Sequence, residues 1–415
     1  MSESFAALRC RDFRVYIGTR LFFTFAYQMQ TVITGFYIYH LTESVFLLGL
    51  FGLFEAVPAI TIALYGGYIA DKSEKRKMLL WIYTAVLFCS LVLLCVTMTS
   101  VQVFISTAVL IKIIFFLVFC NGIARAFLGP ANFTIYTESL PKEAYANGNS
   151  WNSTVRQTGS ILGPAVGGIV YGYFGITAAL VLIVLFILMA LITACFLNKY
   201  PPVFTPKENF WKSLAVGIQF VFRNKMMLGA MSLDLFAVFF GGFVALLPVF
   251  ANDILKVGPQ GLGLMRASTS TGAILVMLLM TKYSPMHKPW RNLLLAITGF
   301  GLSIICFGIS KNFYLSLFLL FASGGFDSVN MLIRGTIMQL LTPDTMRGRV
   351  SAVTSMFIDS SNEIGDFESG TVAGLIGTVP AVVVGGCITL TVVGITYCKT
   401  KKYMSFSIGD IHPEI

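Results

Sequence analysis

The stretch "GGYIADKSEKRK", residues 66–77, concentrates charge in a chain that otherwise avoids it. Six of the seven residues from Asp71 to Lys77 are charged, whereas only 12% of all 415 residues are. Uncharged apolar runs flank the stretch on both sides. A short charged connection between two such runs is typical of a loop that joins two transmembrane helices at the membrane surface.

The composition extends this interpretation to the whole chain. Hydrophobic residues make up 56% of it, which is more apolar surface than a water-soluble fold can bury. A helix needs about 20 mostly apolar residues to cross a bilayer, and twelve stretches meet this requirement. They are 15–40, 44–70, 78–99, 103–137, 146–173, 176–197, 226–250, 260–281, 292–310, 313–341, 350–376 and 379–398. We therefore predict an all-α membrane protein with twelve transmembrane helices.

The distribution of lysine and arginine predicts the orientation in the membrane. Of 29 basic residues, 21 lie on one side of the predicted helices, two on the other (Lys256 and Lys311) and six within them. Because basic residues favour cytoplasmic loops, we expect both termini in the cytoplasm of a bacterium and the chain in its inner (plasma) membrane. This asymmetry accounts for the net charge of +10 without a nucleic-acid partner.

The chain divides near its middle into two similar halves. We predict a six-helix bundle over 1–197, a cytoplasmic linker over 198–225 with an amphipathic helix at 209–222, a second bundle over 226–398 and a cytoplasmic tail over 399–415. Offsets of 202, 211 and 214 residues align parts of the two halves. The 202 offset places four glycines on four others: Gly163 on Gly365, Gly168 on Gly370, Gly172 on Gly374 and Gly175 on Gly377. Parallel repeats of this kind are a plan of secondary transporters.

The opening stretch resembles the signature of the major facilitator superfamily between its second and third helices. The matching residues are Gly67, Asp71, Lys72, Lys75 and Arg76, with Glu74 in place of a second glycine. The resemblance implies two pseudosymmetric six-helix bundles that transport by alternating access. It also implies a conformational latch in which Asp71 reaches the helix end near Arg347 and Arg349. The alternative is that the basic residues only anchor the topology.

A second motif, "GSILGPAVGG" at 159–168, resembles the signature of drug and metabolite antiporters in the same superfamily. Its matching residues are Gly159, Gly163, Pro164, Gly167 and Gly168. We expect this small-residue surface to face "ASTSTGA" (267–273) of the second half, although ordinary glycine packing is the alternative. Residues 233–255 and 342–353 resemble the branch that holds the enterobactin exporter and macrolide efflux proteins.

Charged side chains inside a membrane are functional candidates because their burial is unfavourable. The resemblance implies that four of them line the cavity: Arg20, Arg125, Asp234 and Asp327. In the repeat Arg125 falls on Asp327 and Arg20 on Asp234, and Glu55 likewise falls on Arg266. We predict opposite charges that exchange partners when an acid is protonated. Static ion pairs that hold helices in register are the alternative.

Two further polar groups are candidates. Asp359, Glu363 and Asp366 share one face of the helix predicted over 350–376. They suit a proton relay or the negative wall of a cation-accepting cavity, and a divalent metal site is a weaker alternative. Tyr27, Gln28 and Gln30 suit a hydrogen-bonding patch for a large amphipathic substrate, or helix packing.

These observations predict a proton-coupled exporter of a hydrophobic or amphipathic small molecule, such as a siderophore or a drug. An importer of a small solute or metal ion with the same fold is the alternative. The chain contains neither a G-x-x-x-x-G-K-[ST] phosphate loop nor an H-E-x-x-H zinc motif. We therefore expect no enzymatic activity, no cofactor and no resident metal, and we expect a monomer in the lipid bilayer.

Overall fold

The computed structural model describes residues 7–141, 144–199, 210–283, 285–343, 346–401 and 404. Every regular element in these ranges is a helix, so the predicted all-α class is confirmed. The chain forms two compact units. Unit 1 comprises Met1–Glu43, Leu50–Pro206 and Val257–Ala267, and unit 2 comprises Ser44–Gly49, Lys207–Lys256 and Ser268–Ile415. The predicted domain boundaries stay a prediction.

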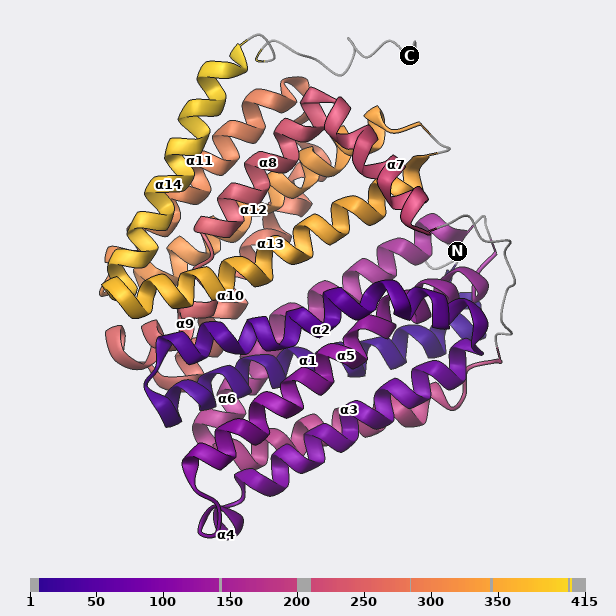
Figure 1. Cartoon of the computed structure of the whole chain (residues 1–415), viewed down its shortest axis with the longest axis vertical. Coiled ribbons are helices and arrows are strands. Elements are labelled where there is room, and N and C mark those ends of the chain that lie inside the picture. The colour runs from indigo at the N-terminus through magenta and orange to yellow at the C-terminus, as the bar shows by residue number, and fades with distance from the viewer. Residues whose placement is uncertain are drawn as a thin grey trace. The chain divides into compact units, whose positions relative to one another are not determined.

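The first half of the chain forms six α-helices. They are α1 (Arg11–Thr42), α2 (Val45–Lys72), α3 (Lys75–Thr97), α4 (Thr99–Gln102), α5 (Thr107–Glu138) and α6 (Tyr145–Ala194). Figure 1 shows α3 and α5 side by side, with the short α4 at their junction. Helix α6 also packs along α1.

Helix α6 contains a break within its 50 residues. Gly175 has φ 80° and ψ 175°, a backbone conformation that essentially only glycine adopts. The break falls between the predicted spans 146–173 and 176–197, so α6 is two helices joined at this glycine.

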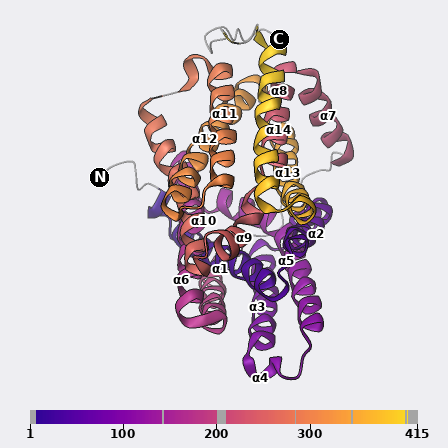
Figure 2. The ribbon, with the colours of Figure 1, turned by 90° about the vertical axis from the view of Figure 1, so that its left-hand side faces the viewer.

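The second half forms eight α-helices. They are α7 (Phe210–Arg223), α8 (Lys225–Phe240), α9 (Leu247–Val249), α10 (Gly258–Lys282), α11 (Pro289–Ile309), α12 (Phe313–Leu341), α13 (Arg347–Ile376) and α14 (Thr378–Lys399). Figure 2 shows α11, α12 and α14 running alongside one another in unit 2. The indole of Trp290, 1% exposed, belongs to a core that α8, α11, α12 and α14 share. Its Nε1 donates a hydrogen bond of 2.8 Å to Thr400 Oγ1.

Helix α8 is shorter than the predicted span of 226–250. It begins at an Asn224 cap, whose side chain accepts hydrogen bonds from the main-chain nitrogens of Met226 and Met227, and it ends at Phe240. The chain continues through Gly241 and Gly242 into a 3₁₀ turn, the short α9 and a π-helical turn over Phe250–Ile254. The predicted span is confirmed by length and composition over Met226–Ile254, but its helix is interrupted after Phe240, because two successive glycines favour the end of a helix.

Nine helical segments in the described ranges are long and apolar enough to cross a membrane, with α6 counted once. Helices α1 and α13 are not among them, and both carry several charged residues. The number twelve stays a prediction, which requires α1 and α13 to cross the membrane and α6 to cross it twice. The amphipathic stretch expected at 209–222 is observed as α7.

The backbone carries the internal repeat. Gly377, which lies 202 positions after Gly175, has φ 94° and ψ 156°, so both members of this aligned pair adopt a glycine-only conformation. Glu43 and Lys256, 213 positions apart, are the two non-glycine residues with positive φ in the described ranges, at 50° and 54°. The repeat therefore extends to loop conformations that the sequence alignment did not include.

Helices α10 and α12 cross in unit 2 at two reciprocal glycines. A Cβ atom on Gly272 would overlap the carbonyl oxygen of Phe321, and one on Gly324 would overlap that of Thr269. Small residues at both positions thus allow the two backbones to approach closely.

We predict that Gly272→Ala and Gly324→Ala each lower the free energy of unfolding by about 1–3 kcal/mol, the usual cost of overpacking. The measurement is denaturant unfolding of the purified protein in detergent micelles. Gly335→Ala is the matched control on α12, because an added Cβ there meets no atom within 4 Å. Equal losses of stability in all three variants would contradict the proposed close crossing.

Candidate functional site

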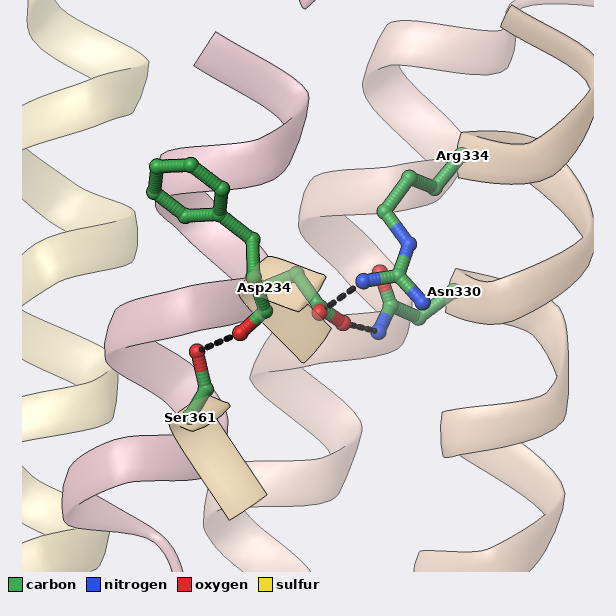
Figure 3. Close-up of polar contacts among 5 residues, drawn as sticks. Asp234, Asn330, Arg334 and Ser361 are labelled. Carbon is green, nitrogen blue, oxygen red and sulfur yellow. Dashed lines mark hydrogen bonds and ion pairs between the residues drawn. The ribbon is translucent and has the colours of Figure 1, made fainter. Parts of the chain in front are cut away.

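Unit 2 contains a buried ion pair between α8 and α12. The Asp234 carboxylate, 4% exposed, accepts from the guanidinium Nη1 of Arg334, 6% exposed, through Oδ2. Asn330 Nδ2 donates to the other carboxylate oxygen, Oδ1, at 2.6 Å. Figure 3 shows Asn330 and Arg334 reaching the same carboxylate from successive turns of α12. Both oxygens of this acid are therefore paired.

The spacing along α12 explains this arrangement. Asp327, Asn330 and Arg334 follow one another at intervals of three and four residues, so they share one helix face. Asp327 lies one turn before Asn330 on this face. A polar line thus runs along α12 from Asp327 to Asn330 and Arg334, and the last two contact Asp234. On α13, which packs against α8, Ser361 Oγ donates to the Phe357 carbonyl oxygen at 2.7 Å (Figure 3).

Arg334 and Asn330 are not among the site residues predicted from the sequence. Repeat alignment compares equivalent helices and cannot identify a partner on a different helix of the same bundle. The available signal was the interval of three and four residues that places Arg334 on the Asp327 face of a predicted transmembrane helix.

Unit 1 has its own buried acid, Glu55 on α2. The hydroxyl of Tyr27 on α1 donates to Glu55 Oε1. Nη1 of Arg125 on α5 lies 3.7 Å from the same oxygen, and the Arg125 side chain is 36% exposed. This distance exceeds that of a normal hydrogen bond, so the pair is looser than the one in unit 2.

A close approach of α5 to α2 brings Arg125 near Glu55. A Cβ atom on Gly122 of α5 would overlap the carbonyl oxygen of Glu55, and it would lie 2.6 Å from Pro58 Cγ. Pro58 within α2 cannot donate its nitrogen to the carbonyl one turn earlier. Glycine on one helix and proline on the other thus shape the contact beside the acid.

The predicted substrate patch on α1 is divided between different neighbours. Tyr27 contacts Glu55, and Gln30 Oε1 accepts from Ser90 Oγ of α3 at 2.9 Å. Both side chains line a small cavity within unit 1. Gln28 instead lies beside α6, where a Cβ atom on Gly163 would be 2.8 Å from its Cβ. The structure therefore groups Tyr27 with Gln30 and separates Gln28 from them.

The other charged residues predicted for the site differ in their partners and burial. Arg20 Nη1 donates to the hydroxyl of Tyr16 at 2.7 Å, one turn earlier on α1. Arg266 on α10 is half-buried, as are Glu363 and Asp366 on α13, whereas the side chain of Asp359 lies outside the described residues. In the described part of the chain, no three His, Cys, Asp or Glu residues are grouped to hold a metal ion. Exchange of partners between the halves stays a prediction.

The glycine motif of α6 has two faces in unit 1. Cβ atoms on Gly159, Gly163 and Gly167 would meet Thr24, Gln28 and Ile33 of α1. A Cβ on Gly168 would lie 2.8 Å from Gly263 Cα of α10. Most of the motif therefore packs against α1, and Gly168 contacts the part of α10 that belongs to unit 1. The expected contact with 267–273 stays a prediction.

The charged stretch that opens the sequence is described only in part. Arg76 Nη2 donates to the carbonyl oxygen of Cys195 at 2.5 Å, and Lys75 Nζ donates to that of Ser73 at 3.1 Å. A cation at the C-terminus of α6 is favourable because unpaired carbonyls and the helix dipole make that end negative. Arg76 thus has a structural role within unit 1. The side chains of the other latch candidates, Gly67, Asp71, Lys72, Arg347 and Arg349, lie outside the described residues.

We predict that Arg334→Met lowers the free energy of unfolding by about 3–5 kcal/mol, because it leaves the Asp234 carboxylate buried without its cation. The double variant Asp234→Leu/Arg334→Met should recover most of that loss, since neither charge of this pair then remains buried. Denaturant unfolding in micelles measures both. A double variant as unstable as the sum of the two single variants would contradict an interaction between these residues.

Comparison with known proteins places these features in a family. A model of the transmembrane secretion effector family matches residues 2–406. The MFS-type transporter YfmI of Bacillus subtilis is 20% identical over 395 residues, which cover 92% of this chain and 95% of YfmI. The enterobactin exporter EntS of Shigella boydii is 22% identical over 341 residues, which cover 81% of this chain and 78% of EntS.

A solved structure shares the fold. That of the nucleoside transporter NupG aligns with a TM-score of 0.71 at 12% identity, covering 94% of this chain and 100% of that one. At this identity the likeness concerns the fold alone. Together with the family match, it identifies the chain as a multi-pass membrane transporter of the major facilitator superfamily, in its transmembrane secretion effector family.

Proposed function

We propose that this transporter is a proton-coupled exporter of a hydrophobic or amphipathic small molecule, such as a siderophore or a drug. It would work by alternating access, as a monomer in a bacterial inner membrane with both termini in the cytoplasm. The family match and the similarity to an enterobactin exporter support export of this class of molecule.

The observation that carries the proposal is the polar line from Asp327 to Arg334. Asn330, one turn from Asp327, donates its amide nitrogen to Asp234, while its buried Oδ1 has no hydrogen-bond partner. A carboxylate can only accept hydrogen bonds, but a protonated carboxyl group can also donate one. Protonation of Asp327 would supply the donor that Asn330 Oδ1 lacks, so the amide can turn over.

Turning the amide changes the environment of the buried ion pair. Asn330 would then withdraw its donor from Asp234, and that carboxylate would depend on Arg334 alone. Protonation of Asp327 would in this way remove a hydrogen bond from a second acid, Asp234, on another helix. Coupling of this kind needs two discrete arrangements of a hydrogen-bonded network, which the side-chain amide provides.

An importer of a small solute or metal ion is the second candidate, because solved structures of similar fold include the nucleoside transporter NupG and a bacterial metal transporter. Direction can be measured in everted membrane vesicles with an acidified interior. Accumulation of enterobactin, a macrolide or a fluorescent dye inside them supports export. Uptake only into right-side-out vesicles with acid outside would instead support import.

We predict that Asp327→Asn preserves expression and folding but abolishes proton-driven transport of whichever of these probes is carried. Asparagine cannot take up or release a proton, so residue 327 can no longer cause the Asn330 amide to turn. Asp327→Glu, which keeps a titratable group, is the control and should retain part of the activity. Unimpaired transport by Asp327→Asn would remove Asp327 from the mechanism.

A further inference from the structure

The contact between α1 and α6 in unit 1 fixes the relative height of these two helices. A Cβ atom on Gly159 of α6 would lie 2.5 Å from Thr24 Cγ2 of α1. One turn further along both helices, a Cβ atom on Gly163 would lie 2.8 Å from Gln28 Cβ. Facing positions thus differ by 135 in residue number, 24 against 159 and 28 against 163, and the two helices run parallel along this contact.

Two arginines lie one turn before this contact, one on each helix. Arg20 precedes Thr24 by four residues, and Arg156 precedes Gly159 by three. Each arginine therefore lies on the helix face that carries the contact. With the same difference of 135, Arg156 faces position 21, which is next to Arg20. The fold thus brings two cations to one level of unit 1, and both lie within predicted transmembrane spans.

No ion pair in the described part of the chain includes either of these arginines. Arg20 is half-buried and donates to the hydroxyl of Tyr16, which is 1% exposed, whereas Arg156 is exposed. Neighbouring like charges disfavour each other, and each charge is unfavourable within a membrane. An anion bound between the two guanidinium groups would relieve both costs, and the exposure of Arg156 leaves it a way in.

A third polar group on the same face of α6 also needs a partner. Asn152 lies four residues before Arg156, and its buried Oδ1 accepts no hydrogen bond within the described ranges. Buried polar atoms rarely lack a partner, and an amide oxygen requires a donor. The guanidinium groups offer the opposite chemistry, because their planar forks bind carboxylates and similar oxyanions. Unit 1 thus presents donors for an oxyanion and, one turn away, an acceptor for a hydroxyl or N–H group.

We propose that Arg20, Arg156 and Asn152 bind the polar end of the exported molecule, which carries an oxyanion and a separate hydroxyl or N–H donor. The two guanidinium groups hold the oxyanion, and the Asn152 amide oxygen accepts from the donor. The hydroxyl of Tyr16 positions the Arg20 guanidinium. The inference rests on the proposed export of an amphipathic small molecule and narrows that class to anions. A phospholipid phosphate is the other source of an oxyanion in a membrane.

Calorimetric titration of the purified protein in a neutral detergent tests the site with three probes. 3-Hydroxybenzoate carries both the oxyanion and the donor, benzoate lacks the donor, and 3-hydroxybenzamide lacks the charge. We expect 3-hydroxybenzoate to bind most tightly. Arg156→Gln should weaken its binding by about 10- to 100-fold, because hydrogen bonds to a charged group are lost. Asn152→Leu should remove the preference for 3-hydroxybenzoate over benzoate.

Two further variants separate the fork from the charge. Arg156→Lys keeps the charge without the fork and should recover part of the affinity. The matched control is Lys112→Gln, which removes an exposed cation from a predicted transmembrane span of α5 and should leave binding unchanged. Should Arg20→Gln fail to fold, the exposed Arg156 still provides the measurement.

The proposal is overturned if 3-hydroxybenzoate does not bind, if 3-hydroxybenzamide binds equally well, or if Arg156→Gln leaves the affinity unchanged. Displacement of the probe by phosphatidylglycerol at equimolar amounts would also overturn it, in favour of a lipid site. These titrations use no pH gradient and therefore do not depend on proton coupling. Binding as expected, without transport in everted vesicles, would contradict the proposed function and support the site.

Discussion

Charge buried in a membrane protein must find a partner, and this requirement shapes both halves of the molecule. An unpaired charge at the bilayer centre costs about 2.5–3.5 kcal/mol on insertion scales. Asp234 meets the requirement with Arg334 and Asn330, and Glu55 meets it with Tyr27 and Arg125. A site that changes its charge must therefore rearrange its partners, which is the physical link between a proton and a conformational change.

Glycine makes this pairing possible. Partners on different helices can meet only where the two backbones approach closely, and glycine permits that approach. Gly122 brings α5 against α2 at the position of Glu55, and Gly272 and Gly324 bring α10 against α12. In lipid, helices gain little from burying apolar surface, so close van der Waals contact and polar bonds hold them together. The small residues and the buried charges thus depend on each other, because close packing at the small residues brings the charged side chains to their partners.

The sequence contained enough to predict the helical class, the break in α6 and the repeat, because these depend on local properties: apolar length, a glycine-only backbone and spacing along the chain. Gly175 and Gly377 illustrate this well. The partners within the site were harder to predict. Which face a helix turns toward its neighbour depends on packing. The sequence pattern therefore does not identify Arg334 as the partner of Asp234, and it groups Gln28 with Tyr27 and Gln30 although Gln28 lies beside α6. The end of α8 at Gly241 was missed because apolar length continues beyond it.

The two halves repeat their backbone but not their chemistry. Asp327 occupies the position that corresponds to Arg125 after the 202-residue offset, and the cation of unit 2 lies seven residues further along α12. Seven residues are two helical turns, or about 10.5 Å. The backbone of Gly175 and Gly377, with positive φ and extended ψ, is one that essentially only glycine adopts, so sterics preserve glycine at this position in both halves. A buried acid, in contrast, accepts any cation or donor within reach, so its partner can come from a different turn or a different helix. The charge sites must therefore be worked out separately in each half, from the contacts that each one makes.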